Sequence, residues 1–119
     1  MQADPNSLDI SVLTSGPHAV VGVTGELDMA TSQLLQAVLD DLLRSRREPK
    51  IQRLVLDCSG LSFVDVSGLS PVLHARAVLS RRGGTLRLSR PTPSLVQVLD
   101  ILGLRDEPNF ASVPAPQPS

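Results

Sequence analysis

Hydrophobic and polar residues alternate in two short segments near the start of the chain. Leu8, Ile10 and Val12 alternate with polar neighbours in residues 7–14, which is the period-two pattern of a strand with one buried face. The turn sequence Ser-Gly-Pro follows, and residues 18–25 are then rich in valine. The pattern predicts two strands paired as a hairpin.

The spacing of hydrophobic residues changes to that of a helix after Asp28. Five aliphatic residues recur at helical spacing: Leu34, Leu35, Val38, Leu39 and Leu42. Asp28 is a favourable N-cap, so the pattern predicts a helix from there to about Arg46. Residues 51–58 are nearly continuously apolar in their second half, which predicts a central strand covered on both faces.

The second half of the chain predicts a helix, a strand and a helix. Residues 67–82 form the first of these helices, closed by two glycines, although Pro71 cannot donate a backbone hydrogen bond to Ser67. Its first turn is therefore expected to be irregular, or the helix to start no earlier than Ser67. Residues 85–89 predict a short strand, and residues 92–104 a helix capped by Thr92 with proline at its first position.

The order of these elements predicts an α/β fold with a small mixed sheet of four to five strands and about three helices. Right-handed crossover connections should place the helices on one side or at one end of the sheet. We expect one domain over residues 1–107, followed by a Pro-rich, disordered tail over residues 108–119. A brief edge strand around Phe110 is an alternative for the start of this tail.

Composition and charge exclude several classes of function. The 119 residues contain 2% aromatic residues, no Trp or Tyr, and a formal net charge of −1, so neither base-stacking nor a basic surface predicts direct nucleic-acid binding. A core of Leu, Val and Ile is expected. The single cysteine, Cys58, can form neither an internal disulfide nor a thiolate zinc site. No apolar run is long enough to cross a bilayer and no secretory signal is present, so we expect a cytoplasmic protein without a membrane segment.

The segment LSFVDVSGLS, residues 61–70, carries the strongest candidate chemistry, with Ser67 beside a carboxylate and a glycine. The stretch lacks the first glycine of the G-x-S-x-G elbow of hydrolases. His74 lies about 10 Å further along the same predicted helix, too far for direct proton transfer, and His18 cannot be placed. These arguments weigh against a catalytic serine, and we expect no enzyme activity, metal site or cofactor.

Two other interpretations of Ser67 remain open. Asp65 and Ser67 can cap the second helix, because both side chains accept backbone N–H bonds, and the residues alone favour this reading. A hydroxyl in the first turn of a helix can also carry a phosphate, since free N–H groups and the helix dipole stabilise an anion there.

Three segments together resemble the STAS domain of bacterial anti-sigma factor antagonists, also called anti-anti-sigma factors. They are VTGELDMAT at 23–31, LVLDCSGLSFVDVSGL at 54–69 and RRGGTLRLSRPTPSLVQVLDILGL at 81–104. The resemblance implies that Ser67 is phosphorylated by a serine kinase that is also the anti-sigma factor. It also implies partner switching: the unphosphorylated protein binds this kinase and releases a sigma factor, and a phosphatase acting on phospho-Ser67 restores binding.

The resemblance also implies a set of partner-binding residues around the serine, namely Glu26, Asp28, Asp57, Ser59, Asp65, Gly68 and Leu69. From the residues alone, Glu26 belongs to a solvated turn and Asp28 to a helix cap. Asp57 is expected to accept hydrogen bonds from loop amides near Ser59 and so to fix the loop that presents Ser67. Cys58 is expected to be a packing residue.

The chain departs from the pattern of the family at two positions. Val66 stands where many relatives have a second serine, which leaves Ser67 as the one hydroxyl at the helix start. Pro71 is unusual at a helical position and is expected to reshape the loop that a kinase reads. The alternative function is a STAS-type module that senses a ligand or acts as a scaffold without phosphorylation. The flank of the sheet is expected to stay partly open for a partner or for a second copy in a homodimer.

Overall fold

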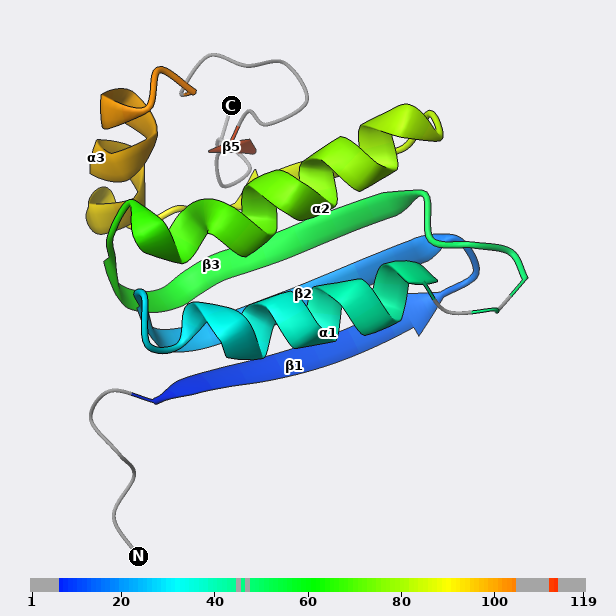
Figure 1. The fold of residues 1–119 in the computed structure, drawn as a ribbon, viewed down its shortest axis with the longest axis horizontal. Coiled ribbons are helices and arrows are strands. Elements are labelled where there is room, and N and C mark those ends of the chain that lie inside the picture. The colour runs from blue at the N-terminus through cyan, green and yellow to red at the C-terminus, as the bar shows by residue number, and fades with distance from the viewer. Residues whose placement is uncertain (1–6, 45, 47, 105–111, 114–119) are drawn as a thin grey trace, which may run out of the picture.

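A computed structural model describes residues 7–44, 46, 48–104 and 112–113, which form one sheet and three helices. The strands follow one another across the sheet in chain order (Figure 1). They are β1 (Leu8–Ser15), β2 (His18–Leu27), β3 (Arg53–Val64), β4 (Thr85–Ser89) and β5 (Ser112–Val113). β1 and β2 form the expected antiparallel hairpin, and the other neighbouring strands are parallel. The predicted α/β class and mixed sheet are confirmed.

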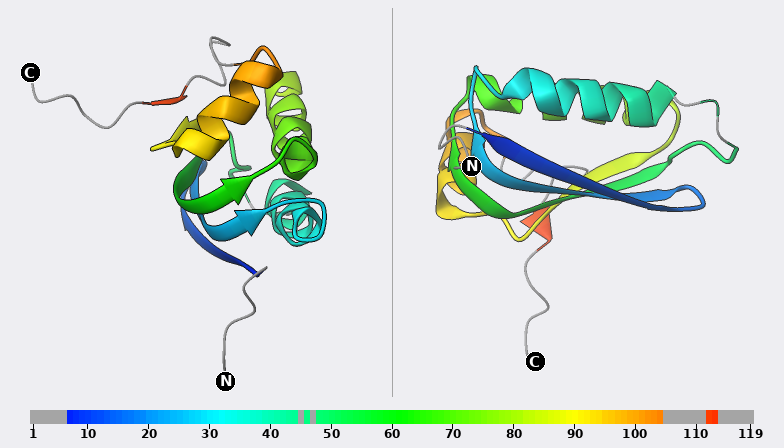
Figure 2. Two further views of the ribbon diagram at one scale, coloured as in Figure 1. Left: turned by 90° about the vertical axis from the view of Figure 1, so that its left-hand side faces the viewer. Right: turned by 90° about the horizontal axis from the view of Figure 1, so that it is seen from below.

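The three helices are α1 (Ser32–Arg44), α2 (Ser70–Arg81) and α3 (Pro93–Ile101). α1 and α2 lie side by side over one face of the sheet, and α3 lies at the end of the sheet where α2 begins (Figures 1 and 2). This is the arrangement that right-handed crossovers predict. At the far end of α2, the Arg82 guanidinium donates to the carbonyl oxygens of Leu43 and Ile51, which ties the ends of α1 and α2 together.

An aliphatic core fills the space between the sheet and the helices, as the composition predicts. Burial of such side chains is the main stabilising term, about 25 cal/mol for each Å² of apolar surface removed from water. The largest fully buried side chains are Leu27, Leu35, Leu39, Ile51, Leu54, Leu56, Leu69, Leu79, Leu86, Leu88 and Leu95.

The prediction that residues 51–58 form a strand covered on both faces is wrong. Leu54, Leu56 and Cys58 are buried beneath the helices, but Arg53 and Ser59 are exposed on the other face of β3. The apolar run misleads because Val55, between the two buried leucines, is itself only partly buried. The same alternation continues on β2, so the described sheet has one open face.

β3 is also longer than predicted, since it continues through Ser-Gly-Leu-Ser-Phe to Val64. These residues were expected to form a loop because serine and glycine usually mark turns. They remain a strand because Leu61 and Val64 are buried and pair in register with Gly25 and Leu27 of β2. β3 therefore ends at Val64, immediately before Asp65.

The second predicted helix is divided in two just before Pro71, between Leu69 and Ser70. A single 3₁₀ turn, η1 (Ser67–Leu69), precedes α2, and the N–H of Ser70 donates to the carbonyl of Ser67. Pro71 has no N–H to donate to the Ser67 carbonyl, so this carbonyl instead accepts the N–H of Ser70 in a tighter, 3₁₀-type bond. The proline itself is buried in the first turn of α2.

The third helix begins at Pro93 as predicted, but the Thr92 hydroxyl does not cap it. The carbonyl oxygen of Thr92 accepts the N–H of Val96, while its Oγ1 is buried and has no hydrogen-bond partner among the described residues. The residues around Phe110 and most of the predicted tail lie outside the described part of the chain. Ser112–Val113 pair with Leu88 and Ser89 as a two-residue edge strand. Among the described residues, no helix combines the length and the apolar character needed to span a bilayer.

Candidate functional site

Ser67 lies in an exposed turn at the end of β3, and a carboxylate organises this turn. The Ser67 hydroxyl donates to Oδ1 of Asp65 at 2.8 Å, and the N–H of Gly68 donates to the same oxygen at 2.8 Å. Asp65 therefore caps η1, as one interpretation of the sequence predicts. Ser67 does not cap the helix: its hydroxyl donates to a side chain and points to solvent.

Two neighbouring elements hold the backbone just before this turn. The N–H of Asp65 donates to the carbonyl of Leu27 at 3.2 Å. On the other side, Ser94 in the first turn of α3 accepts the N–H of Val64 at 2.9 Å, and its Oγ donates to the Val64 carbonyl at 3.3 Å. The Ser94 side chain thus pairs with the end of β3 much as another strand would. Nothing in the local sequence around Ser94 indicates this contact.

Gly68 and Leu69 are buried beneath the turn and do not face solvent. A Cβ atom on Gly68 would collide with the carbonyl oxygen of Leu27, so only glycine allows η1 to lie against the end of β2. The side chain of Leu69 is 1% exposed and belongs to the core. Any contribution of these two residues to partner binding is therefore through the position of Ser67.

A second acidic turn lies directly beside η1. Asp28 lies four residues before Ser32, the first residue of α1. Its Oδ1 accepts the N–H groups of Ala30 at 2.9 Å and of Thr31 at 3.0 Å. Asp28 thus caps the turn that leads into α1. The Cβ position of Gly68 faces the backbone of both Leu27 and Asp28, so the two turns are in contact.

Thr31 is a residue of this site that the sequence analysis missed. Its side chain is 4% exposed, and its hydroxyl donates to the Glu26 carbonyl at 2.7 Å. The same oxygen accepts the N–H of Asp28 at 3.1 Å. The spacing Asp28-x-x-Thr31 just before a helix resembles a capping box, and this signal was available in the sequence. Thr31 and Asp28 together fix the backbone that carries Glu26.

Asp57 and Ser59 lie apart from this pair of turns, on the open face of the sheet. Asp57 Oδ1 accepts the N–H of Ser59 at 3.1 Å and its hydroxyl at 2.8 Å, and Oδ2 forms an ion pair with Arg90 at 2.8 Å. The predicted bond to an amide near Ser59 is present, but within a strand and not in a loop. Arg90, whose φ is 51°, was not singled out from the sequence.

These bonds change the acidity of Asp57. Burial alone would raise the pKa of its carboxyl, but the hydrogen bonds from Ser59 and Arg90 stabilise the carboxylate more strongly. The net result is a pKa below the ordinary value. Burial raises the pKa of the neighbouring Cys58 thiol to about 12, helped by the charge of Asp57, so Cys58 is a buried thiol, in keeping with the expected packing role.

Large hydrophobic side chains are exposed around the two turns. Met29 is 73% exposed between Asp28 and Thr31, and Val66 is 46% exposed next to Ser67. The start of α1 lies at the same end of the molecule as the two turns (Figure 1), and Leu34, in its first turn, is 52% exposed. Exposed apolar residues beside acidic ones are typical of a surface that binds a protein. These residues are absent from the predicted site, because a hydrophobic residue within a turn carries no sign in the sequence that its side chain is exposed.

The histidines do not assemble a catalytic site with Ser67. His74 lies 3.9 Å from Asp40 of α1, and His18 begins β2 in register with Arg53 at the opposite end of the parallel strands. Within the described ranges, no group of three or more His, Cys, Asp or Glu residues is arranged to hold a metal ion.

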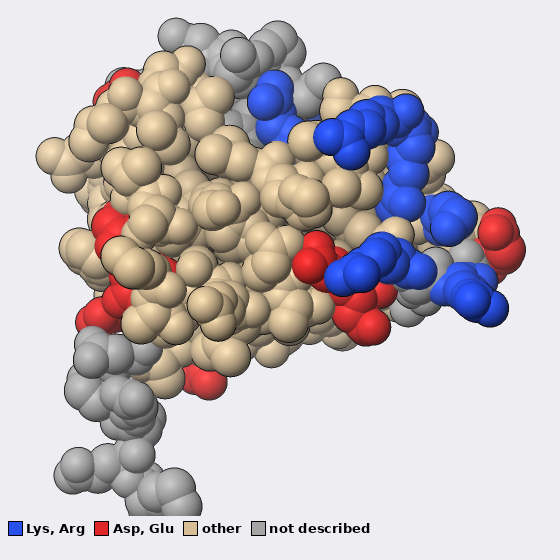
Figure 3. Space-filling model, in the orientation of Figure 1, with Lys and Arg blue, Asp and Glu red and all other residues tan. Residues whose placement is uncertain are grey.

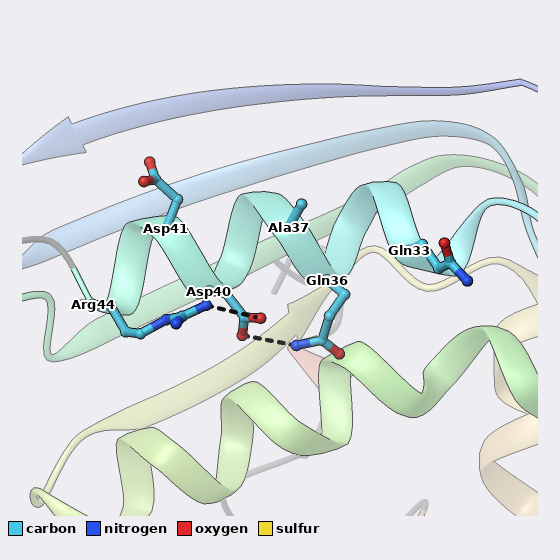
Figure 4. A pocket seen from close by; sticks show the side chains of 6 residues that line it. All are labelled: Gln33, Gln36, Ala37, Asp40, Asp41 and Arg44. Carbon is cyan, nitrogen blue, oxygen red and sulfur yellow. Dashed lines mark hydrogen bonds and ion pairs between the residues drawn. The ribbon is translucent and has the colours of Figure 1, made fainter.

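One hollow in the described surface lies away from Ser67, along the exposed side of α1. It has a volume of about 600 Å³, and its six lining residues come from that single helix (Figure 4). Gln36 donates to Asp40 at 2.8 Å, and Arg44 pairs with Asp40 at 3.3 Å. These polar groups satisfy one another along the helix, so we assign no function to this hollow.

Comparison with known proteins connects this geometry to a family. A model of the STAS domain matches residues 9–115. The chain is 29% identical over 85 residues to the anti-sigma F factor antagonist of Paenibacillus polymyxa, covering 71% of this chain and 70% of that protein. A crystal structure of an anti-sigma factor antagonist from Mycobacterium paratuberculosis has a similar fold. Its TM-score is 0.78 at 23% identity, over 97% of this chain and 92% of that one. The phosphorylated form of the Bacillus cell fate determinant SpoIIAA has a TM-score of 0.68 at 22% identity, over 88% and 91% of the two chains.

Proposed function

Since this chain belongs to the STAS domain family, we propose that it is an anti-sigma factor antagonist. It binds an anti-sigma factor that is also a serine kinase, and so releases a sigma factor. Phosphorylation of Ser67 ends this binding, and a phosphatase acting on phospho-Ser67 restores it. These partners place its action in the bacterial cytoplasm.

The exposure and the bonding of Ser67 carry the proposal. The hydroxyl is held at 2.8 Å from the Asp65 carboxylate, in an exposed turn that β2 and α3 both support. A kinase needs the oxygen of its substrate to be exposed and oriented. The likeness to a protein whose structure is known in a phosphorylated form agrees with this role for the turn.

The proposed contact surface consists of the two adjoining turns and the hydrophobic residues on them. Met29 and Val66 supply exposed apolar area, while Glu26, Asp28 and Asp65 supply negative charge. Such a surface suits a partner with a hydrophobic centre and cationic groups at its rim. Gly68 and Leu69 support this surface from beneath. Asp57 and Ser59 act at a distance, through the ion pair that fixes Arg90 ahead of α3.

A phosphate on Ser67 acts as a switch through charge and desolvation. It adds about −1.5 to −2 charges beside the Asp65 carboxylate and removes the hydroxyl proton that this carboxylate binds. Burial of such a group in an interface without a cationic partner costs several kcal/mol. Each 1.4 kcal/mol lowers affinity about tenfold, so one phosphate is sufficient to dissociate the complex.

A pull-down from an extract of the source bacterium tests the proposal. The baits are the wild-type protein, Ser67→Ala and Ser67→Asp, and mass spectrometry identifies both the bound proteins and any phosphate on the bait. We expect an ATPase of the histidine-kinase-like class on the first two baits, none on Ser67→Asp, and phosphate on Ser67 of the wild type.

Ser80→Asp is the matched control. Ser80 is an exposed serine in α2, the helix that follows the Ser67 turn, and it lies near the far end of that helix. It should retain the same ATPase as the wild type. Identical partners on all baits, together with no phosphate on Ser67, would overturn the proposed switch.

A further inference from the structure

The sheet has one face that the helices leave open. β2, β3 and β4 run parallel, and parallel strands are usually buried on both faces. Here α1 and α2 cover one face, and neither of them reaches the other (Figure 2). On this open face Leu13 is 73% exposed and Val20 is 42% exposed. The face therefore has the exposed apolar area of an interaction surface.

A hollow of about 490 Å³ lies on this face, where the three parallel strands begin. The open-face side chains that line it are cationic, hydroxyl-bearing or apolar: His18, Val20, Arg53, Val55, Thr85 and Arg87. Arg53 is in register with Thr85, and Val55 with Arg87, so the two arginines lie on neighbouring strands, two residues apart along them. By the spacing and rise of strands, their Cα atoms are about 8 Å apart.

The two arginines of the hollow have no ionic partner. Arg53 and Arg87 are both exposed, and neither forms an ion pair within the described residues. The one carboxylate of β3, Asp57, is paired with Arg90 instead. Neighbouring guanidinium groups repel each other, so an anion between them relieves this repulsion and accepts hydrogen bonds from both. The hollow is thus suited to an anionic group.

We propose that this hollow binds an acidic segment of a partner protein, in which carboxylates are followed by hydrophobic side chains. The carboxylates pair with Arg53 and Arg87, each of which can bind a carboxylate through two parallel hydrogen bonds. The hydrophobic side chains lie on the apolar row that leads from Arg87 to β1, through Val55, Val20 and Leu13 in register. Strands are about 4.8 Å apart, so this row extends about 14 Å, the reach of about four extended residues.

The chemistry of the face favours a peptide over other anions. A free anion such as phosphate would pair with the arginines but leave Leu13 and Val20 exposed. An anionic membrane or a nucleic acid is bound by a broader cationic surface. Here Asp9 and Asp57 line a second hollow on the same face, beyond the apolar row, and would repel such a surface. A short acidic segment with hydrophobic residues avoids these carboxylates and covers the apolar row.

This surface is separate from the Ser67 turn. Arg53 is the first residue of β3, whereas Ser67 lies three residues beyond Val64, the last residue of that strand. The hollow and the turn therefore lie at opposite ends of β3. An acidic partner can bind the open face while an anti-sigma factor contacts the turn, so the protein can connect two partners.

Fluorescence anisotropy with labelled synthetic peptides tests the proposal on the full chain. The acidic probe carries adjacent Glu residues followed by alternating Ser and Leu, and the matched basic probe has Lys in place of Glu. We expect saturable binding of the acidic probe. The double variant Arg53→Glu, Arg87→Glu should weaken it at least about tenfold and should bind the basic probe instead, because attraction becomes repulsion. Arg81→Glu, at the end of α2, should bind the acidic probe as the wild type does.

The apolar row has its own matched pair of variants. Val20→Ser removes apolar area from the proposed surface and should weaken binding of the acidic probe severalfold. Val12→Ser is the control, because Val12 is similarly exposed, at 40%, but lies on the other face of the hairpin, in register with the buried Val21. No saturable binding of the acidic probe, or equal losses in Val20→Ser and Val12→Ser, would overturn the proposal.

Two further measurements distinguish other occupants of this face. Binding to phosphatidylserine vesicles that Arg53→Glu abolishes would mean that a lipid surface covers it. A dimer in sedimentation that the same substitution dissociates would mean that a second copy covers it, and either result would contradict an acidic peptide as the occupant. Ser67→Asp should bind the acidic probe as the wild type does, so this proposal and the proposed switch are tested separately.

Discussion

Asp65 is the residue on which both the shape and the chemistry of the Ser67 turn depend. One of its oxygens receives the hydroxyl of Ser67 and the N–H of Gly68. The first bond orients the group that we propose is phosphorylated, and the second closes the 3₁₀ turn. Asp65 can therefore cap the turn while Ser67 accepts a phosphate. The two interpretations of this segment are compatible, which explains why the sequence alone did not decide between them.

Removal of the Asp65 carboxylate should cost stability, whereas removal of the Ser67 hydroxyl should not. Asp65→Ala removes the carboxylate that accepts the N–H of Gly68 at 2.8 Å and leaves this N–H only the longer bond of 3.1 Å to the backbone carbonyl of residue 65, and loss of a cap costs about 1 kcal/mol. Ser67→Ala removes only an exposed donor, so its effect should stay within about 0.5 kcal/mol. Urea unfolding measures the free energy of unfolding of both variants and of the wild type. Equal losses in the two variants would show that the bond between Ser67 and Asp65, not the cap on Gly68, stabilises the turn.

Thr31 should matter to stability more than its place in an exposed turn suggests. Thr31→Ala leaves the partly buried N–H of Asp28 without its side-chain acceptor and removes the bond to the Glu26 carbonyl. An unsatisfied buried group costs about 1–3 kcal/mol, so this partly buried N–H should cost about 1 kcal/mol. Ser32→Ala, which loses one exposed bond of 3.3 Å, is the control and should be nearly neutral. Thermal unfolding of the two variants checks this; the account is wrong if Ser32→Ala is the more damaging change.

The lowered pKa of Asp57 predicts a dependence of stability on acid. A carboxyl with a lower pKa in the folded state adds stability at a pH above its unfolded pKa of about 3.9. That contribution disappears as the pH falls through the folded pKa. The wild type should therefore lose more stability than Asp57→Asn between about pH 5 and about pH 3.

The difference between these two proteins should stay below about 1 kcal/mol, because the ion pair with Arg90 is partly exposed. Urea unfolding at a series of pH values measures it. Parallel curves for the two proteins would mean that Asp57 is not stabilised as a carboxylate in the folded state.

The elements themselves were largely predictable, because most of them follow from hydrophobic spacing alone. The hairpin, α1, β4 and the start of α3 at Pro93 agree with the pattern. The errors have physical causes. β3 continues through a Ser-Gly segment because its pairing with β2 outweighs turn propensity, and Pro71 divides the second helix because its missing N–H forces a tighter turn.

Contacts between elements distant in the chain could not be predicted from local patterns. Ser94 meets Val64 across 30 residues, and Arg90 meets Asp57 across 33. Both contacts tie the segment around the start of α3 to β3 and so connect that helix to the site. Asp65 was predictable as a cap because it acts on neighbouring residues, whereas Asp28 was predicted to cap the first helix but lies four residues before Ser32 and caps only the turn ahead of α1.

Ser94→Ala should loosen the end of β3 and slow phosphorylation. The substitution removes the acceptor of the Val64 N–H, at a cost of about 1 kcal/mol. Amide exchange at Val64 and Asp65 should accelerate, and the kinase should modify Ser67 more slowly. Ser80→Ala, at an exposed position in α2, should change neither rate. Unchanged exchange at Val64 in Ser94→Ala would contradict the role given to this contact.

The molecule as a whole carries its charges unevenly along its length. Most of the Lys and Arg side chains in view gather at the end away from the Ser67 turn (Figure 3). Arg44, Lys50 and Arg81 belong to that end, whereas Glu26, Asp28 and Asp65 surround Ser67. A partner that binds the acidic end should therefore present cations, and a phosphate adds negative charge where it is already concentrated.

This distribution predicts that association with the partner kinase weakens with salt. Raising the ionic strength from about 0.05 M to about 0.5 M shortens the screening length severalfold and should slow association. Arg81→Glu, at the far end, should leave the association rate unchanged, while Glu26→Lys should lower it. Surface plasmon resonance measures these rates, and an association rate that does not depend on salt would exclude electrostatic attraction at the acidic end.

The affinity of the purified partner kinase for the protein before and after phosphorylation tests the central claim most directly. Isothermal titration calorimetry, with the phosphorylated protein prepared by the kinase and checked by mass spectrometry, gives both values. Phosphate on Ser67 should weaken binding by about a hundredfold or more, since a group of about −1.5 to −2 charges must then be desolvated beside the Asp65 carboxylate at the apolar centre of the interface, away from the cations at its rim. Equal affinities for the two forms would contradict the proposal that Ser67 controls this protein.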